Sequence, residues 1–205
     1  DRAGTTRTLT HEAVSTIHRN YGLKVAAHLT CVDATRTETL AIAESYAAAG
    51  VTEIVALRGD APKGAQRFVP HPLGFANSVE LVEKLARTGK FKIRVGAYPE
   101  PHPDAADSTA DVTWLKRKID AGASSAITQF FFDADTFFRF RDACARAGIT
   151  APIIPGILPI TSWEGAKKFA RRCGTTVPQK LDEAFATAAR DGREDLLALT
   201  QCTAL

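Results

Sequence analysis

The sequence predicts an α/β protein, a (β/α)8 TIM barrel of which this chain supplies only part. Short apolar runs alternate with helical patterns, in the order of one helix followed by five strand–helix units. The predicted strands lie roughly 25–35 residues apart, the length of a βαβ unit, which implies a parallel sheet. A doubly wound open sheet also fits this order. Its GxGxxG signature is absent after the first strand, as is a Walker A loop, so the barrel is favoured.

The strands are predicted from apolar runs that end in polar residues. The run from Ile54 to Leu57 is continuous, which is typical of a strand buried on both faces. The predicted strands are residues 24–31, 51–60, 91–98, 123–132 and 152–158. A barrel needs about 250 residues, so we expect roughly three strands to be missing from this chain of 205 residues.

The helices are predicted from apolar residues at helical spacing, with Val14 and Ile17 facing inward on the first. The predicted helices are residues 11–20, 35–49, 75–88, 108–121, 135–147 and 162–172, and residues 177–204 are helical without a clear strand. Capping side chains are expected at Thr10, Thr35 with Glu38, Ser108 with Asp111, and Ser162. Glycine is expected to end helices at Gly50, Gly89, Gly122 and Gly148.

The composition is that of an ordinary globular protein, which we expect to form one domain over residues 1–205. A net charge of +3 argues against a strongly basic nucleic-acid binder, and no apolar run reaches the ~20 residues of a membrane span. The four cysteines lack CxxC spacing and suit a reducing cytoplasm. We expect no nucleic-acid or membrane partner, and a homo-oligomer whose size the sequence does not indicate.

Polar residues gather where the predicted strands end. In a barrel these ends form one face, the face that carries the active site. The residues are His28, Thr30 and Cys31, then Arg58, Gly59 and Asp60, then Tyr98, Glu100 and His102, then Gln129, then 155–159. The loop 61–74, which follows the second strand, is long for a simple connection, and such loops commonly carry function.

Each of these residues also has a structural interpretation. His28 lies among apolar residues as a core histidine would, and Arg58 could pair with Asp60 across the intervening glycine. Gln129 lies in an otherwise apolar strand, where a buried amide needs a partner that a ligand could provide.

One helical face combines charge with an aromatic ring. Asp111, Trp114 and Lys118 lie at positions i, i+3 and i+7, and Arg117 adds a second cation. This set suits a ring system with phosphates, although Asp111 could equally be a capping residue and the two cations a solvated surface.

A metal site is the main alternative. Glu100 and His102, with His28 and Asp60, are suitable ligand types for a metal-dependent barrel hydrolase. The strands carry no HxH pair, which disfavours this hypothesis.

Six short motifs in a fixed order give the chain a specific resemblance. They are HLTC (28–31), ALRGD (56–60), AYPExH (97–102), DxxxLKRKxDAGA (111–123), ITQFFFD (127–133) and PIIPGILP (152–159). Together they resemble the methylenetetrahydrofolate reductase family, over about residues 21–185. The resemblance implies a barrel that holds FAD, with this chain supplying about strands three to seven and lacking the first two and the last, so that it is incomplete at both ends.

The resemblance also implies roles for individual residues. The implied FAD contacts are His28, Arg58, Gly59, Asp60, Phe75, Ala76, Tyr98, His102, Asp111, Trp114, Arg117 and Lys118. The implied folate contacts are Asp60, Gln129 and Phe169, with Asp60 also catalytic, and no residue binds a metal. Gly165 departs from the family pattern, because a glutamine can stand there.

The implied activity is reduction of 5,10-methylenetetrahydrofolate to 5-methyltetrahydrofolate, within one-carbon metabolism and methionine biosynthesis. NADH, or else NADPH, gives hydride to flavin N5 and leaves before the folate binds in its place. The proton donor of the family is a glutamate on the first strand, which this chain lacks. We therefore expect the isolated chain to be inactive, and a non-catalytic fragment is the third hypothesis.

Overall fold

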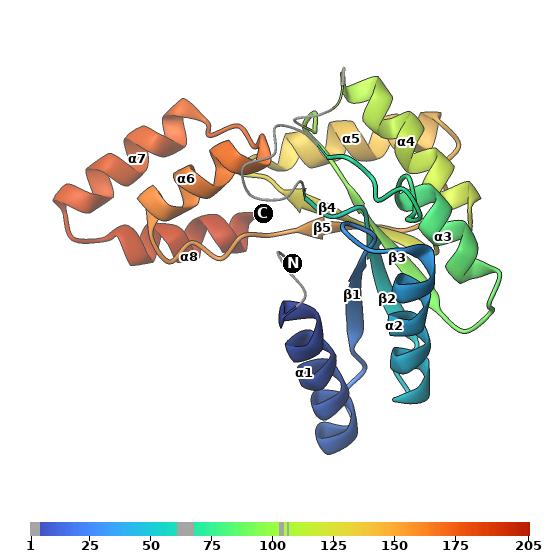
Figure 1. The fold of residues 1–205 in the computed structure, drawn as a ribbon. Helices are drawn as coiled ribbons and strands as arrows, with labels where there is room; N and C mark the ends of the chain where they lie inside the picture. The colour runs from blue at the N-terminus through green and yellow to red at the C-terminus, as the bar shows by residue number, and fades with distance from the viewer. Residues whose placement is uncertain (1–4, 61–67, 103–104, 106) are drawn as a thin grey trace. The chain divides into compact units, whose positions relative to one another are not determined.

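The computed structural model describes residues 5–60, 68–102, 105 and 107–205. Within these residues five strands form one sheet in the order β1-β2-β3-β4-β5, which is also their order in the sequence (Figure 1). The strands are β1 Ala26–Thr30, β2 Glu53–Leu57, β3 Lys92–Ala97, β4 Ser125–Phe130 and β5 Ile153–Gly156. A parallel sheet whose strands follow the chain order is the arrangement of a (β/α)8 barrel, so the predicted fold class is confirmed.

Eight helices are present in the described residues. They are α1 Thr5–Tyr21, α2 Arg36–Ala48, α3 Ser78–Ala86, α4 Ser108–Asp120, α5 Ala134–Arg146, α6 Trp163–Cys173, α7 Gln179–Arg190 and α8 Glu194–Ala204. None of them is both long and apolar enough to cross a membrane.

The chain divides into two compact units. The first comprises Asp1–Gly96 and Arg117–Ala126, and the second comprises Ala97–Lys116 and Ile127–Leu205. The expectation of one domain over the whole chain stays a prediction.

Parallel pairing aligns the strands of the first unit. His28 on β1 lies opposite Val55 on β2, and Val55 lies opposite Arg94 on β3. Arg94 reaches along the sheet to Glu53, with 2.5 Å between Nη2 and Oε2. This hydrogen bond, with the charge of Arg94, lowers the pKa of Glu53 although partial burial opposes the shift.

Helices α1 and α2 pack on β1, and α3 packs on β2 (Figure 1). A small core of Ala27, Tyr46 and Val51 receives Val14 from α1 and Ile42 from α2. The inward position predicted for Val14 is thus confirmed.

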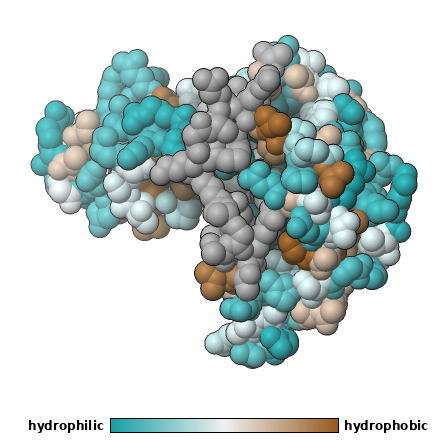
Figure 2. Space-filling model, in the orientation of Figure 1, coloured by the Kyte–Doolittle hydropathy of each residue, from teal (hydrophilic) through white to brown (hydrophobic). Residues whose placement is uncertain are grey.

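In the second unit, helices α6, α7 and α8 enclose an aromatic core. The Trp163 and Phe185 rings stack at 4.1 Å, and Phe132 meets Trp163 edge to face at 5.4 Å. The fully or largely buried members of this core are Phe130, Phe132, Trp163, Ala166, Ala170, Phe185 and Ala198. On the face drawn in Figure 2 hydrophilic residues predominate over these helices, as expected when their apolar sides face a shared core.

Three predicted details are wrong. Helix α1 begins at Thr5, so Thr10 lies inside it and is not a cap. A helix that packing has nucleated extends at little cost, even through polar residues. Ile17 is 39% exposed rather than inward-facing. Helix α4 is capped by Asp107, whose Oδ1 accepts from the Ala110 amide at 2.8 Å, so Ser108 and Asp111 do not form a capping box.

Other predicted helix signals are confirmed. Thr35 and Glu38 form the expected capping box on α2, and the Ser162 hydroxyl accepts from the Gly165 amide at the start of α6. The predicted stop glycines all have positive φ: Gly50, Gly89, Gly122 and Gly148. Half of the predicted long loop 61–74, residues 61–67, lies outside the described residues.

Candidate functional site

The ends of β1 and β2 are joined by backbone and side-chain contacts in the first unit. The Cys31 amide donates to the Leu57 carbonyl at 3.3 Å, and its Sγ donates to the Arg58 carbonyl at 3.4 Å. Gly59 has φ +91°, and a Cβ there would come within 2.6 Å of Cγ1 of Val32. These contacts require glycine at position 59 and fix the backbone on both sides of it.

Arg58 and Asp60 lie immediately before and after Gly59 in this turn. Arg58 Nε donates to the Gly59 carbonyl at 3.3 Å, and its guanidinium lies 4.8 Å from the centroid of the Phe68 ring. No ion pair joins Arg58 to Asp60 in the described residues, so the structural interpretation of this pair is wrong. The Asp60 side chain is exposed, which leaves its carboxylate accessible to a ligand.

His28 lies on the opposite face of β1 from the buried Ala27 and Leu29. Its side chain keeps contact with solvent, but the protein atoms around it remove enough water to lower the pKa of His28. The imidazole is therefore neutral at pH 7 and can both donate and accept a hydrogen bond.

Phe75 and Ala76 precede α3. Phe75 is 1% exposed, and the Arg36 guanidinium lies 5.1 Å from the centroid of its ring. The Ala76 amide donates to Glu80 at 3.3 Å, and the same Oε2 atom accepts from Arg36 at 2.5 Å. In this structure Phe75 is a core residue, so a flavin contact by its ring stays a prediction.

The two cations of α4 that the resemblance assigns to FAD, Arg117 and Lys118, differ in burial. Lys118 is 5% exposed and its ammonium donates to the Gly96 carbonyl of β3, so it is not part of a solvated surface. Arg117 is exposed. Of these two side chains Arg117 is thus the more accessible to a phosphate.

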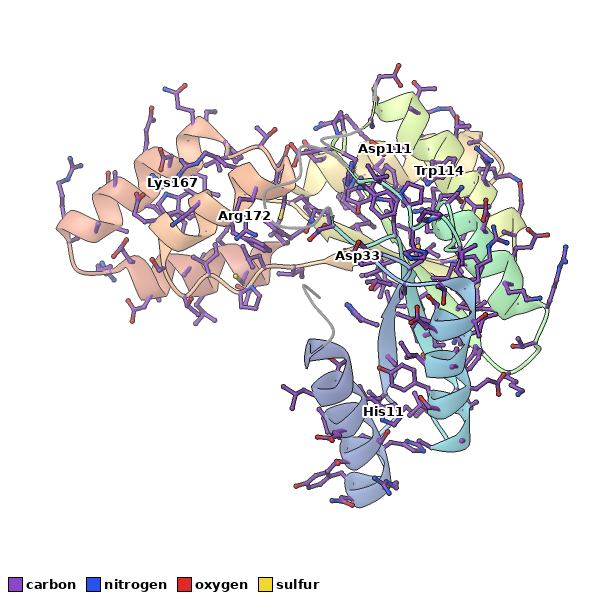
Figure 3. All side chains as sticks on the ribbon, in the orientation of Figure 1. His11, Asp33, Asp111, Trp114, Lys167 and Arg172 are labelled. Atoms are coloured by element: carbon purple, nitrogen blue, oxygen red, sulfur yellow. The ribbon has the colours of Figure 1, made fainter. Side chains whose placement is uncertain are left out.

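In the second unit, three of the predicted flavin residues form a connected set. The Tyr98 and His102 rings meet edge to face with centroids 4.6 Å apart. The His102 amide donates to Oδ2 of Asp111 at 2.8 Å. Trp114 lies one helical turn beyond Asp111 on α4 (Figure 3). The loop after β3 is thus held against the start of α4 by a residue that sequence reasoning interpreted as a cap.

Phe130 contacts both predicted folate residues of this unit, Gln129 and Phe169. The Phe169 ring is 41% exposed and stacks on the Phe130 ring at 5.3 Å with an interplanar angle of 17°. Gln129 precedes Phe130, and its Oε1 accepts from the Phe130 amide at 3.1 Å. Phe130 thus contacts Gln129 through its backbone amide and Phe169 through its ring, and an amide and an exposed aromatic ring are the kinds of group that bind a flat heterocycle.

Sequence reasoning missed the contacts of the turn between α6 and α7. Thr175 is buried and its hydroxyl donates to the Phe130 carbonyl at 3.2 Å. The Thr176 amide donates to both carboxylate oxygens of Glu100, at 3.0 and 3.1 Å. Contacts between residues 45 and 76 positions apart leave no signal in a local pattern, so only the fold reveals them.

The metal hypothesis gains nothing from the structure. No group of three or more His, Cys, Asp or Glu side chains in the described residues could hold a metal ion. Glu100, the proposed ligand beside His102, instead accepts from the Thr176 amide.

Comparison with known proteins gives consistent matches. The family model described as methylenetetrahydrofolate reductase matches residues 1–197. The 5,10-methylenetetrahydrofolate reductase of Salmonella typhimurium is 47% identical over 87% of this chain and 58% of that protein. Methylenetetrahydrofolate reductase (NADH) 1 of Zea mays is 36% identical over 94% of this chain and 33% of that protein. The chain thus spans about three fifths of the Salmonella relative.

A likeness among solved structures concerns the fold alone. A 2,3-dimethylmalate lyase of the PEP mutase/isocitrate lyase superfamily superposes with a TM-score of 0.52 at 14% identity, covering 91% of this chain and 66% of that chain.

Proposed function

The chain belongs to the methylenetetrahydrofolate reductase family, and on that premise we propose that the protein reduces 5,10-methylenetetrahydrofolate to 5-methyltetrahydrofolate with a nicotinamide cofactor and FAD. The observation that carries the proposal is the set of side chains where the strands end. The aromatic–imidazole pair of Tyr98 and His102 follows β3, the Gln129 amide lies near the end of β4, and the exposed ring of Phe169 on α6 stacks on Phe130, the last residue of β4. These groups suit flat heterocyclic ligands better than they suit a metal.

The residues fit a flavin on chemical grounds. The Tyr98 and His102 ring pair offers an aromatic wall, and Gly59 allows the positive φ of the turn that separates Arg58 from Asp60. Exposed Arg117 is suited to the pyrophosphate, while buried Lys118 fixes α4 to β3. When bound, FAD would supply the hydride-transfer chemistry that links oxidation of the nicotinamide to reduction of the folate.

The folate would be held by an amide, an aromatic ring and a carboxylate. The Gln129 amide can both donate to and accept from a pterin, and the exposed face of Phe169 can stack on it. The accessible carboxylate of Asp60 can orient a ring nitrogen and stabilise positive charge that develops when the imidazolidine ring opens. We assign the proton donor for this step to none of the residues described above.

The test is the absorption spectrum and activity of the purified full-length protein. We expect a yellow protein with a flavin spectrum that NADH bleaches anaerobically and that methylenetetrahydrofolate restores. Comparing NADH with NADPH identifies the donor, and the name of the Zea mays relative favours NADH. A colourless preparation that contains stoichiometric metal would overturn the proposal in favour of a hydrolase.

A further inference from the structure

The Glu100 carboxylate connects two segments that are distant in the sequence. Both of its oxygens accept from the Thr176 amide, at 3.0 and 3.1 Å. Glu100 lies in the loop after β3, and Thr176 lies in the turn between α6 and α7. Both residues belong to the second unit, so this contact is internal to one compact body.

The loop that carries Glu100 also carries Tyr98 and His102, two residues of the proposed flavin site. Tyr98 and His102 flank Glu100 at two residues on either side, and their rings meet at 4.6 Å. The His102 amide is bound by Asp111 of α4 at 2.8 Å. The loop is therefore fixed to α4 two residues after Glu100, and the Glu100 carboxylate accepts from a partner outside the loop.

The turn that carries Thr176 contacts Phe130, the residue on which the ring of Phe169 stacks. Gly174 ends α6 in the left-handed conformation at φ 73°, and the Thr175 amide donates to the Ala170 carbonyl at 3.0 Å. The Thr175 hydroxyl donates to the Phe130 carbonyl at 3.2 Å. Phe130 in turn carries the stacked ring of Phe169, which lies one residue before Ala170 on α6.

From these contacts we infer that Glu100 is a positioning residue for the proposed reductase, one that holds the Phe169 wall of the folate site to the loop carrying Tyr98 and His102. A hydrogen bond to a charged acceptor is about twice as strong as a neutral one, so one carboxylate can fix the turn. This inference rests on the proposed function only for its kinetic consequence, because the connection itself is structural.

The connection distinguishes Glu100 from a proton donor. Both oxygens of the Glu100 carboxylate accept from the Thr176 amide, so they are directed to the turn between α6 and α7 rather than to a reacting group. Because Glu100 acts through Phe169, its loss should weaken substrate binding equally in the ground state and the transition state. Such a loss raises KM and leaves kcat nearly unchanged.

The experiment compares Glu100→Ala and Glu100→Gln with the exposed-surface control Glu12→Ala, all in the full-length protein. Glutamine keeps one acceptor for the Thr176 amide, whereas alanine keeps none. For Glu100→Ala we expect KM for the folate to rise about tenfold, with kcat and flavin content nearly unchanged. Glu100→Gln should stay within about twofold of the wild type, because one hydrogen bond survives. Glu12→Ala should not change either constant.

Hydrogen exchange gives a readout that does not depend on activity. The peptide that spans residues 170–178 should exchange faster in Glu100→Ala than in the wild type, and Glu100→Gln should protect it. A collapse of kcat in both variants would overturn the inference, because it would identify Glu100 as a group that acts on the reacting atoms. Unchanged KM and unchanged exchange in Glu100→Ala would overturn it as well. If the wild-type protein does not reduce the folate, the proposed function fails, and the exchange data alone decide the connection.

Discussion

The Trp163 indole and the Lys167 ammonium donate to the same carboxylate oxygen of Asp182, at 2.7 and 2.8 Å. Both donors lie on α6 and the acceptor lies on α7, with Lys167 labelled in Figure 3. The hydrogen bond from Lys167, and then that from Trp163, lower the pKa of Asp182. Asp182 therefore holds α7 to α6, the helix that carries Phe169.

Replacing this carboxylate should change stability in a pH-dependent way. A carboxyl group whose pKa is depressed by folding stabilises the fold above its ordinary value of 3.8, and this stabilisation is lost as the pH falls through the folded value. Asp182→Asn should therefore lower Tm at pH 7, with the difference from the wild type vanishing in acid. Thermal unfolding followed from pH 7 to pH 3 measures this difference.

Two further variants sharpen the test. Asp195→Asn, on the exposed start of α8, is the matched control and should leave Tm unchanged. In a Trp114→Phe background the fluorescence reports Trp163 alone, and its emission should shift when Asp182 is replaced. An unchanged Tm at pH 7 would show that the shared oxygen contributes nothing to stability.

Gly59→Ala should be strongly destabilising. The residue has φ +91°, and an added Cβ would approach Cγ1 of Val32 to 2.6 Å and its Cβ to 2.8 Å. Backbone strain and overpacking together should cost about 2–4 kcal/mol of the free energy of unfolding. Urea denaturation measures that cost, and loss of bound flavin is the expected functional result.

Gly89→Ala separates the two causes. Gly89 also has positive φ, at +66°, but a Cβ there would meet nothing within 4 Å. This variant should cost only the strain, about 1 kcal/mol, and should keep its flavin. Equal losses in the two variants would mean that the contact with Val32 is easily relieved.

Asp60→Asn tests the proposed folate contact. The Asp60 carboxylate is exposed, and no ion pair joins it to Arg58 in the described residues, so its charge is not required by that neighbour. In the full-length protein we expect folate reduction to slow at least tenfold, since charge stabilisation is lost, while flavin is retained and NADH oxidation persists. Stopped-flow measurement of the two half-reactions separates these effects. An unchanged folate half-reaction would remove Asp60 from the site.

Local sequence patterns were sufficient for the fold because each element carries its own signal. Periodicity located the strands, and the capping box of Thr35 and Glu38 is complete within four residues. The start of α1 escaped prediction because helix extension leaves no mark in polar residues. The pattern around Asp111 was misread because its partner, the His102 amide, lies before the helix rather than in its first turn.

The candidate site was harder to predict from the sequence, because its contacts join residues that are far apart in the chain. His28 and Gln129 were named because they lie in motifs, and Phe169 was named through the family resemblance, but the surroundings of all three depend on neighbours far along the chain. Burial of Lys118, and of Phe75 beneath Arg36, follows from packing that no local pattern encodes. The bond between Glu100 and Thr176 spans 76 positions, which is why Glu100 could be considered as a metal ligand but not as a connector.

The four cysteines, all free thiols, should differ sharply in reactivity. Cys144 is 0% exposed, and burial raises its pKa from 9.0 to about 11. At pH 8 only about 0.1% of such a thiol is ionised, and the thiolate is the reactive form. Iodoacetamide should therefore modify the partly exposed Cys173 in the native protein and leave Cys144 unmodified until urea unfolds it. Mass spectrometry of peptides alkylated with and without urea measures this. Modification of Cys144 at the rate of Cys173 under native conditions would show that α5 opens readily and that its packing is weaker than the buried thiol implies.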